Sequence, residues 1–120
     1  MAHYIGDVSQ YGHTIPSETH HSDYEGWVAQ RTASFSGGTF ETYISSEPRV
    51  RRSAYVAAKR ISLTVARGKA PILSAVQMDS LWSTKPQPYL DSIGHSLNLG
   101  VNELADVLHT FFANVVDEED

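Results

Sequence analysis

The chain has 120 residues, a formal net charge of -5 and 41% hydrophobic residues. These values are typical of a globular domain with one core, and they exclude a chain that is disordered throughout. The chain contains no cysteine, which excludes disulfide scaffolds, thiol nucleophiles and cysteine-ligated metal sites and favours an intracellular protein, cytoplasmic or nuclear. No apolar run approaches the roughly 20 residues of a membrane helix, so we expect no membrane partner.

The basic residues are concentrated in one segment. Positions 49–69 hold seven of the nine lysines and arginines and no acidic residue, which gives the segment a charge of +7. These seven residues are Arg49, Arg51, Arg52, Lys59, Arg60, Arg67 and Lys69. Cations clustered on one face attract phosphate even when the whole protein is acidic. The alternative interpretation is a solvated face of a helix.

The first part of the chain predicts a helix followed by strands. Apolar residues at helical spacing predict a short helix over 4–11, and the polar run 17–22 is either a strand or a loop. Alternating residues predict a twisted strand over 25–36. The pair Gly37-Gly38 predicts a hairpin turn, because glycine tolerates the positive φ of tight hairpins, and a returning strand follows over 39–44.

The remainder of the chain predicts helices. An apolar stripe beside a basic one predicts an amphipathic helix over 49–66, which ends at Gly68. Residues 70–120 contain three apparent helices, separated by prolines and by Gly100. The last has a broad apolar face formed by Val101, Leu104, Ala105, Leu108, Phe111, Phe112, Val115 and Val116.

Three segments carry a resemblance to a known family. The first helix has Ile5, Asp7, Val8 and Gln10 where the family has Leu, Glu, Leu and Gln. The stretch FSGGTFET at 35–42 looks like the family's Phe-x-Gly-x-x-Phe-Glu-Ser. The stretch RRSAYVAAKRI at 51–61 is similar to its Lys-Lys-x-Ala-Lys-x-x-Ala-Ala-x-x-Leu. In this order and spacing, residues 2–67 resemble the double-stranded-RNA-binding domain (dsRBD) family.

The resemblance implies an α+β fold, in the order helix, three strands, helix, over residues 1–68. The acidic residues 70–120 would then be a helical extension, which either folds as its own unit or completes the core of the domain. By the same resemblance, the function is non-catalytic binding of double-stranded RNA, in RNA silencing as a suppressor or as an accessory factor of a dicing enzyme.

The residues implied to bind RNA come from three regions. A-form RNA is contacted through two minor grooves and the phosphates between them. The implied set is Asp7 and Gln10 for one minor groove, Arg49, Arg51, Arg52 and Lys59 for the phosphates, and His20 or His21 for the second minor groove. The loop HHSDYEG at 20–26 lacks the family's Gly-Pro-x-His, and Tyr55 replaces a basic residue of the second helix.

The alternative function is a protein-interaction or dimerisation module on a dsRBD-like fold that has lost RNA binding. Its surface would be the apolar face of the last helix, with Leu104, Leu108, Phe111, Phe112 and Val115. These side chains either pack in the core of this chain or bind a second copy or another protein. A dimer would place two basic helices in one assembly, so that a weak RNA contact gains avidity.

We expect no enzyme, metal or cofactor. The run His20-His21-Ser22-Asp23 contains metal-ligating residue types, but adjacent histidines on a strand point in opposite directions, and the helical spacing of zinc hydrolases is absent. This pattern favours a solvated loop. Glu103 and Asp106 have the spacing of a carboxylate pair, but they lie opposite the leucines of the last helix, which predicts a solvated face.

Overall fold

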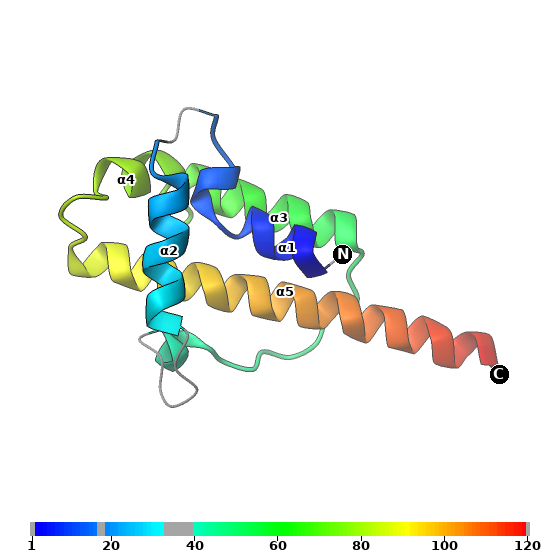
Figure 1. Cartoon of the computed structure of the whole chain (residues 1–120). Helices are drawn as coiled ribbons and strands as arrows, with labels where there is room; N and C mark the ends of the chain where they lie inside the picture. The colour runs from blue at the N-terminus through cyan, green and yellow to red at the C-terminus, as the bar shows by residue number, and fades with distance from the viewer. Residues whose placement is uncertain (1, 17–18, 33–39, 120) are drawn as a thin grey trace.

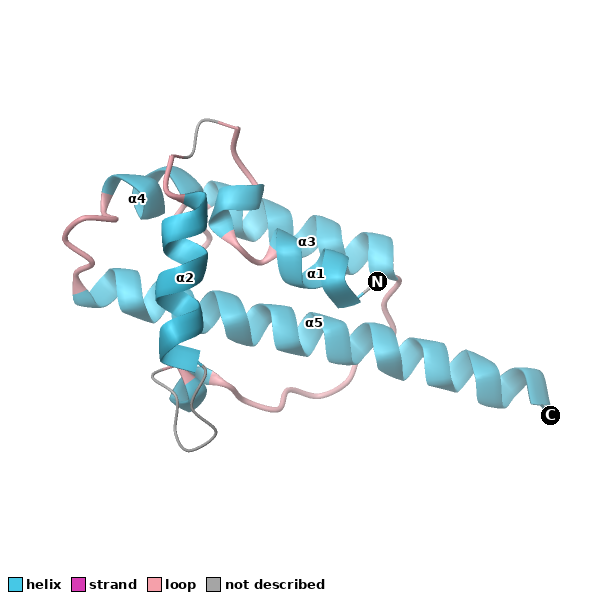
Figure 2. Ribbon diagram, viewed as in Figure 1, coloured by secondary structure: helices cyan, strands magenta, loops and turns pink. Residues whose placement is uncertain are grey.

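The structure is a computed structural model that describes residues 2–16, 19–32 and 40–119, with the side chains of 2, 4 and 116–119 excepted. Over these ranges the chain forms helices and no strand (Figure 2). The helices are α1 (Ala2–Val8), α2 (His21–Thr32), α3 (Ala54–Arg67), α4 (Ala75–Ser80) and α5 (Gln87–Glu119), with 3-10 turns η1 (Tyr11–His13) and η2 (Glu41–Tyr43). The α+β fold implied by the resemblance is therefore wrong, and the fold is all-helical.

The segment predicted as a twisted strand over 25–36 is helical where the structure describes it, because α2 includes residues 25–32. Tyr24, Trp27 and Val28 stand at i, i+3 and i+4, which is the spacing of one helix face. Tyr24 is buried, and Trp27 and Val28 pack partly against the core. On a strand, Ala29 would share a face with Trp27, whereas in α2 Ala29 is exposed. The predicted hairpin turn at 37–38 lies outside the described residues.

The predicted returning strand is replaced by η2 and an extended segment that runs along α5. Phe40 is buried, and residues 44–53 form neither helix nor strand, with extended backbone at both ends, Ile44 and Ser53. The backbone of this segment forms hydrogen bonds with side chains of α5. The Ser45 amide donates to Asn98 Oδ1 at 2.8 Å, and the Glu47 amide donates to Asn102 Oδ1 at 3.1 Å. These amides have partners without a neighbouring strand, which is why an extended segment exists here without a sheet.

Tyr43 anchors η2 on α5. Its hydroxyl donates a hydrogen bond to Asp91, and this bond, with a second from Gln87, holds the pKa of the Asp91 carboxyl below its usual range. The tyrosine ring lies against Gly94, where a Cβ atom would stand 2.3 Å from ring carbons. Glycine inside this helix therefore makes room for an aromatic ring.

The sequence predicts the ends of α3 better than it predicts the fold. Ser53 caps α3 by accepting from the Val56 amide at 3.2 Å, so the helix begins five residues later than predicted. Gly68 ends it with a φ of 70°, as predicted. Gly100, predicted as a break, lies inside the continuous α5. A Cβ there would stand 3.2 Å from the Ser9 side chain, so this glycine permits close packing and does not end the helix.

One core joins the two segments of the chain. Helices α1 and α3 lie along α5, and α2 runs crosswise to them (Figure 1). The largest fully buried side chains include Ile5, Tyr11 and Ile61 from the first 68 residues and Tyr89 and Ile93 from α5. The C-terminal helices thus complete the core. In the part of the chain that the structure describes, no helix is both long and apolar enough to cross a membrane.

Candidate functional site

The arginines of the basic segment meet two carboxylates of α5. Arg52 Nε lies 2.9 Å from Glu103 Oε2 and 3.7 Å from Asp106 Oδ2. Arg60 Nε donates to Glu103 Oε1 at 2.9 Å, and Arg49 Nη1 lies 3.4 Å from Asp106 Oδ1. Glu103 is 4% exposed and Asp106 is 6% exposed. The prediction that these two acids form a solvated face is therefore wrong.

These acids belong to a polar strip on α5 that receives the extended segment. Asp106 Oδ1 also accepts from the Val50 amide at 3.0 Å, and Thr110 Oγ1 accepts from the Arg52 amide at 2.7 Å. Glu103, Asp106 and Thr110 are spaced i, i+3 and i+7, so they share one helix face. Buried carboxylates need partners, and the arginines supply them. Arg49 and Arg52, two of the predicted phosphate contacts, are thus bound to anions of their own chain.

The other predicted phosphate contacts are both exposed: Arg51 lies in the extended segment before α3, and Lys59 lies on α3. The predicted minor-groove residues are engaged locally. His3 Nε2, one turn earlier on α1, lies 3.1 Å from Asp7 Oδ2. Gln10 Nε2 donates to Glu25 Oε1 at 3.0 Å. The structure therefore divides the predicted RNA-binding residues among separate local contacts.

His20 and His21, predicted for the second minor groove, belong to two different groups. His20 stacks on Trp82 with ring centroids 5.4 Å apart, and its Nε2 lies 4.0 Å from Asp79 Oδ1. Lys85 Nζ lies 3.7 Å from the centroid of the same indole ring. His21 is the first residue of α2, and its side chain contacts Glu25, whereas the His20 side chain contacts Trp82 and Asp79. Of the predicted solvated loop, only His20 lies before the helix, because α2 begins at His21, and both histidine side chains are half-buried.

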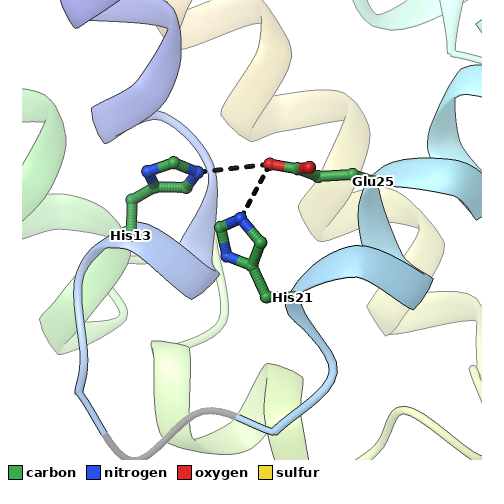
Figure 3. A group of neighbouring side chains, drawn as sticks. All are labelled: His13, His21 and Glu25. Carbon is green, nitrogen blue, oxygen red and sulfur yellow. Dashed lines mark hydrogen bonds and ion pairs between the residues drawn. The ribbon is translucent and has the colours of Figure 1, made fainter.

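His21 is part of a cluster with His13 and Glu25 (Figure 3). His21 Nε2 lies 3.1 Å from Glu25 Oε1, and His13 Nε2 lies 3.2 Å from the same oxygen. The two imidazole centroids are 4.5 Å apart. All three side chains are partly exposed to solvent. Sequence reasoning missed His13 and Glu25 because it placed Glu25 on a strand; on a helix, His21 and Glu25 stand at i and i+4, which was the available signal.

The predicted partner surface is largely exposed. Phe111 is 55% exposed and Phe112 is 61% exposed, with Leu108 also on the surface. Leu104 packs partly against the core, and Val115 is half-buried. This end of α5 projects beyond the other helices (Figure 1). Of the two interpretations of the phenylalanines, packing in the core of this chain is therefore wrong: their rings contact each other, with centroids 5.5 Å apart, and stay on the surface.

No family model and no curated protein matches the sequence, and no solved structure matches the fold.

Proposed function

We propose that this protein is a non-catalytic association module that pairs with a second copy of itself through the distal half of α5. The observation that supports the proposal most is the exposure of Leu108, Phe111 and Phe112 on one stripe of a projecting helix. Large apolar side chains grouped on a surface lose contact with water when another protein covers them, which favours association.

The spacing of this stripe suits a helical partner. Val101, Leu104, Leu108, Phe111 and Val115 follow each other at intervals of three, four, three and four residues. This is the a and d spacing of a coiled coil, in which apolar side chains of one helix insert between those of another. The polar strip of α5 is already occupied by the extended segment of its own chain. The helix therefore binds its own domain with one face and leaves Val101, Leu108 and Phe111 of the a and d stripe exposed.

Charge favours an antiparallel pair. The chain ends in the four acidic residues 117–120. A parallel pair would place the two acidic ends side by side, whereas an antiparallel pair separates them and aligns the helix dipoles favourably. The exposed cations Lys59, Arg67 and Lys69 on and after α3 give the same molecule a surface of opposite charge. A second copy of the chain carries both the acidic residues and these cations, so the two copies offer each other surfaces of opposite charge.

The two-fold axis is expected at the middle of the exposed stripe. An axis between Leu108 and Phe111 places Leu108 of one copy opposite Phe111 of the other, and Leu104 opposite Val115. This arrangement covers the same patch on both copies, as a symmetric dimer requires. The stripe is about two heptads long, which is short for a coiled coil, so we expect a weak dimer that forms at micromolar concentration.

Sedimentation velocity over a concentration series tests the proposal. We expect the mass of the full chain to rise from monomer to dimer through the micromolar range, and Phe111→Asp to remain monomeric. Val76→Asp is the matched control, because Val76 is 64% exposed on α4, at the other end of the molecule (Figure 1). A wild-type chain that stays monomeric, or equal dimerisation of Phe111→Asp, would contradict the proposal. Circular dichroism checks that both variants retain their helices.

Binding of duplex RNA remains a prediction of the sequence, now supported only by exposed cations such as Arg51 and Lys59. Arg49 and Arg52 contribute little to it in this arrangement, because phosphate would have to displace their carboxylate partners. Fluorescence anisotropy with a duplex of about 20 base pairs, which spans one dsRBD-sized site, measures it. Binding that is lost in Arg51→Ala/Lys59→Ala and absent with duplex DNA would support the RNA function.

A further inference from the structure

We propose that His13, His21 and Glu25 form a binding site for a divalent transition metal of the zinc class, which fastens η1 to α2. Two imidazole nitrogens and a carboxylate oxygen are a ligand set that zinc commonly uses in proteins. The nearest metal-ligating atoms of the three side chains all lie within 4.8 Å of one another. Figure 3 shows both imidazoles directed at the carboxylate.

Two of the three distances between ligand atoms match a zinc site, and the third, between the two imidazole nitrogens, is within 4.8 Å. The two contacts from imidazole Nε2 to Glu25 Oε1 measure 3.1 and 3.2 Å. In a tetrahedral zinc site, bonds of about 2.0–2.1 Å place neighbouring ligand atoms about 3.3 Å apart. A metal ion in front of the three atoms would therefore replace two imidazole–carboxylate contacts with three coordinate bonds. The cluster is open to solvent, which leaves water for the remaining coordination position.

The hydrogen bonding around Glu25 points to the same use. Its Oε1 accepts a hydrogen bond from Gln10 Nε2 at 3.0 Å and lies 3.1 and 3.2 Å from the Nε2 atoms of His21 and His13. Three nitrogen atoms thus converge on one carboxylate oxygen, which keeps this oxygen close to both imidazoles. With a metal bound to the nitrogens, the Gln10 amide would still hold the carboxylate in place. Such outer-shell hydrogen bonds orient ligands in metal sites.

The location gives the metal a structural effect. His13 closes η1, while His21 and Glu25 lie one turn apart at the start of α2. A metal between them closes the short connection between these two elements. Because the site is assembled only when η1 and α2 are in place, binding stabilises the folded chain. Neither element belongs to the distal half of α5, so this proposal is independent of dimerisation.

A histidine–aspartate pair on α1 serves as an internal control. His3 and Asp7 on α1 have the same i, i+4 spacing, with 3.1 Å between nitrogen and oxygen. Among the residues that the structure describes, only the cluster of His13, His21 and Glu25 brings three such groups together. A pair binds a metal far more weakly than three converging ligands, so His3→Ala should leave the affinity unchanged.

Titration of the chelator-treated full chain with zinc chloride tests the site. We expect one zinc per chain by calorimetry, a melting temperature that rises with zinc concentration, and a tetrahedral absorption spectrum with cobalt(II). His13→Ala and Glu25→Gln should each weaken zinc binding by more than the roughly 10–100-fold that follows loss of an outer-shell group. An absence of zinc binding, or wild-type affinity in both variants, would overturn the proposal, as would an equal loss in His3→Ala.

Discussion

Replacing Glu103 with glutamine tests whether α5 holds the arginines of the basic segment. The substitution keeps the size of the side chain and removes its charge. Glu103 is 4% exposed, and the Nε atoms of Arg52 and Arg60 lie 2.9 Å from its two oxygens. After the change, Arg52, whose side chain is 15% exposed, keeps only Asp106 at 3.7 Å. A buried cation with one distant partner is unfavourable, so we expect a loss of folding stability.

The size of the loss follows from the exposure of each arginine. Removing one partner of a buried ion pair costs about 3–5 kcal/mol. Asp106 still offsets part of the charge of Arg52, which lowers this figure. The Arg60 side chain is 53% exposed, so its contact with Glu103 adds at most about 1 kcal/mol. We therefore expect Glu103→Gln to lower the free energy of unfolding by about 2–4 kcal/mol, a large part of the roughly 5–15 kcal/mol of a typical domain.

Urea unfolding followed by circular dichroism measures this difference. The matched control is Glu41→Gln, which makes the same chemical change at an exposed position of η2. We expect the control to change stability by no more than about 0.5 kcal/mol. If Glu103→Gln lost no more stability than Glu41→Gln, the arginine–carboxylate network would not fasten the extended segment to α5, and Arg52 would be available to other ligands.

Two further predictions concern glycine packing and acid titration. Gly94→Ala should destabilise the protein by about 1–3 kcal/mol, because its Cβ would stand 2.3 Å from the Tyr43 ring. Gly26→Ala in α2, with nothing within 4 Å of the added Cβ, should stabilise it by up to about 1 kcal/mol; equal effects in thermal unfolding would contradict the packing of Tyr43. Tyr43→Phe should raise the pKa of Asp91 toward its usual value, because the hydroxyl bond that lowers this pKa is lost. The lowered pKa of Asp91 contributes stability that is present above the usual carboxyl range and is lost as the pH falls through the folded-state value. The variant should lack this contribution, and an unchanged Asp91 pKa in a carboxyl NMR titration would refute the role of the hydroxyl.

The sequence predicted individual helices better than their arrangement. The helix ending at Gly68 could be predicted because its apolar stripe and its terminal glycine are local signals. The strand prediction over 25–36 failed because Trp27 and Ala29 alternate over a short window as a strand does, whereas the i, i+3, i+4 series of the helix begins at Tyr24, outside that window. Because α2 is a helix, the sheet of the implied α+β fold loses the strand predicted over 25–36.

The candidate sites were harder to predict because they depend on partners distant in sequence. The charge of the 49–69 segment is visible in the sequence, but its neutralisation depends on Glu103 and Asp106, which lie about 50 residues away. The histidine cluster similarly joins His13 to α2 across a turn of the chain. The exposed stripe at Phe111 could be predicted as a face, since helical spacing is local, although its exposure depends on where the rest of the chain packs.

Site-directed cross-linking tests the central claim, self-association through α5, most directly. The chain has no cysteine, so Ala105→Cys and Val115→Cys each introduce a single reactive thiol beside or on the stripe. The antiparallel pair places position 105, next to Leu104, near position 115 of the second copy. With a short bifunctional maleimide, we predict a cross-linked dimer when the two variants are mixed, little from either alone, and none in a Phe111→Asp background. No dimer in the mixture at high micromolar concentration would contradict self-association through this helix.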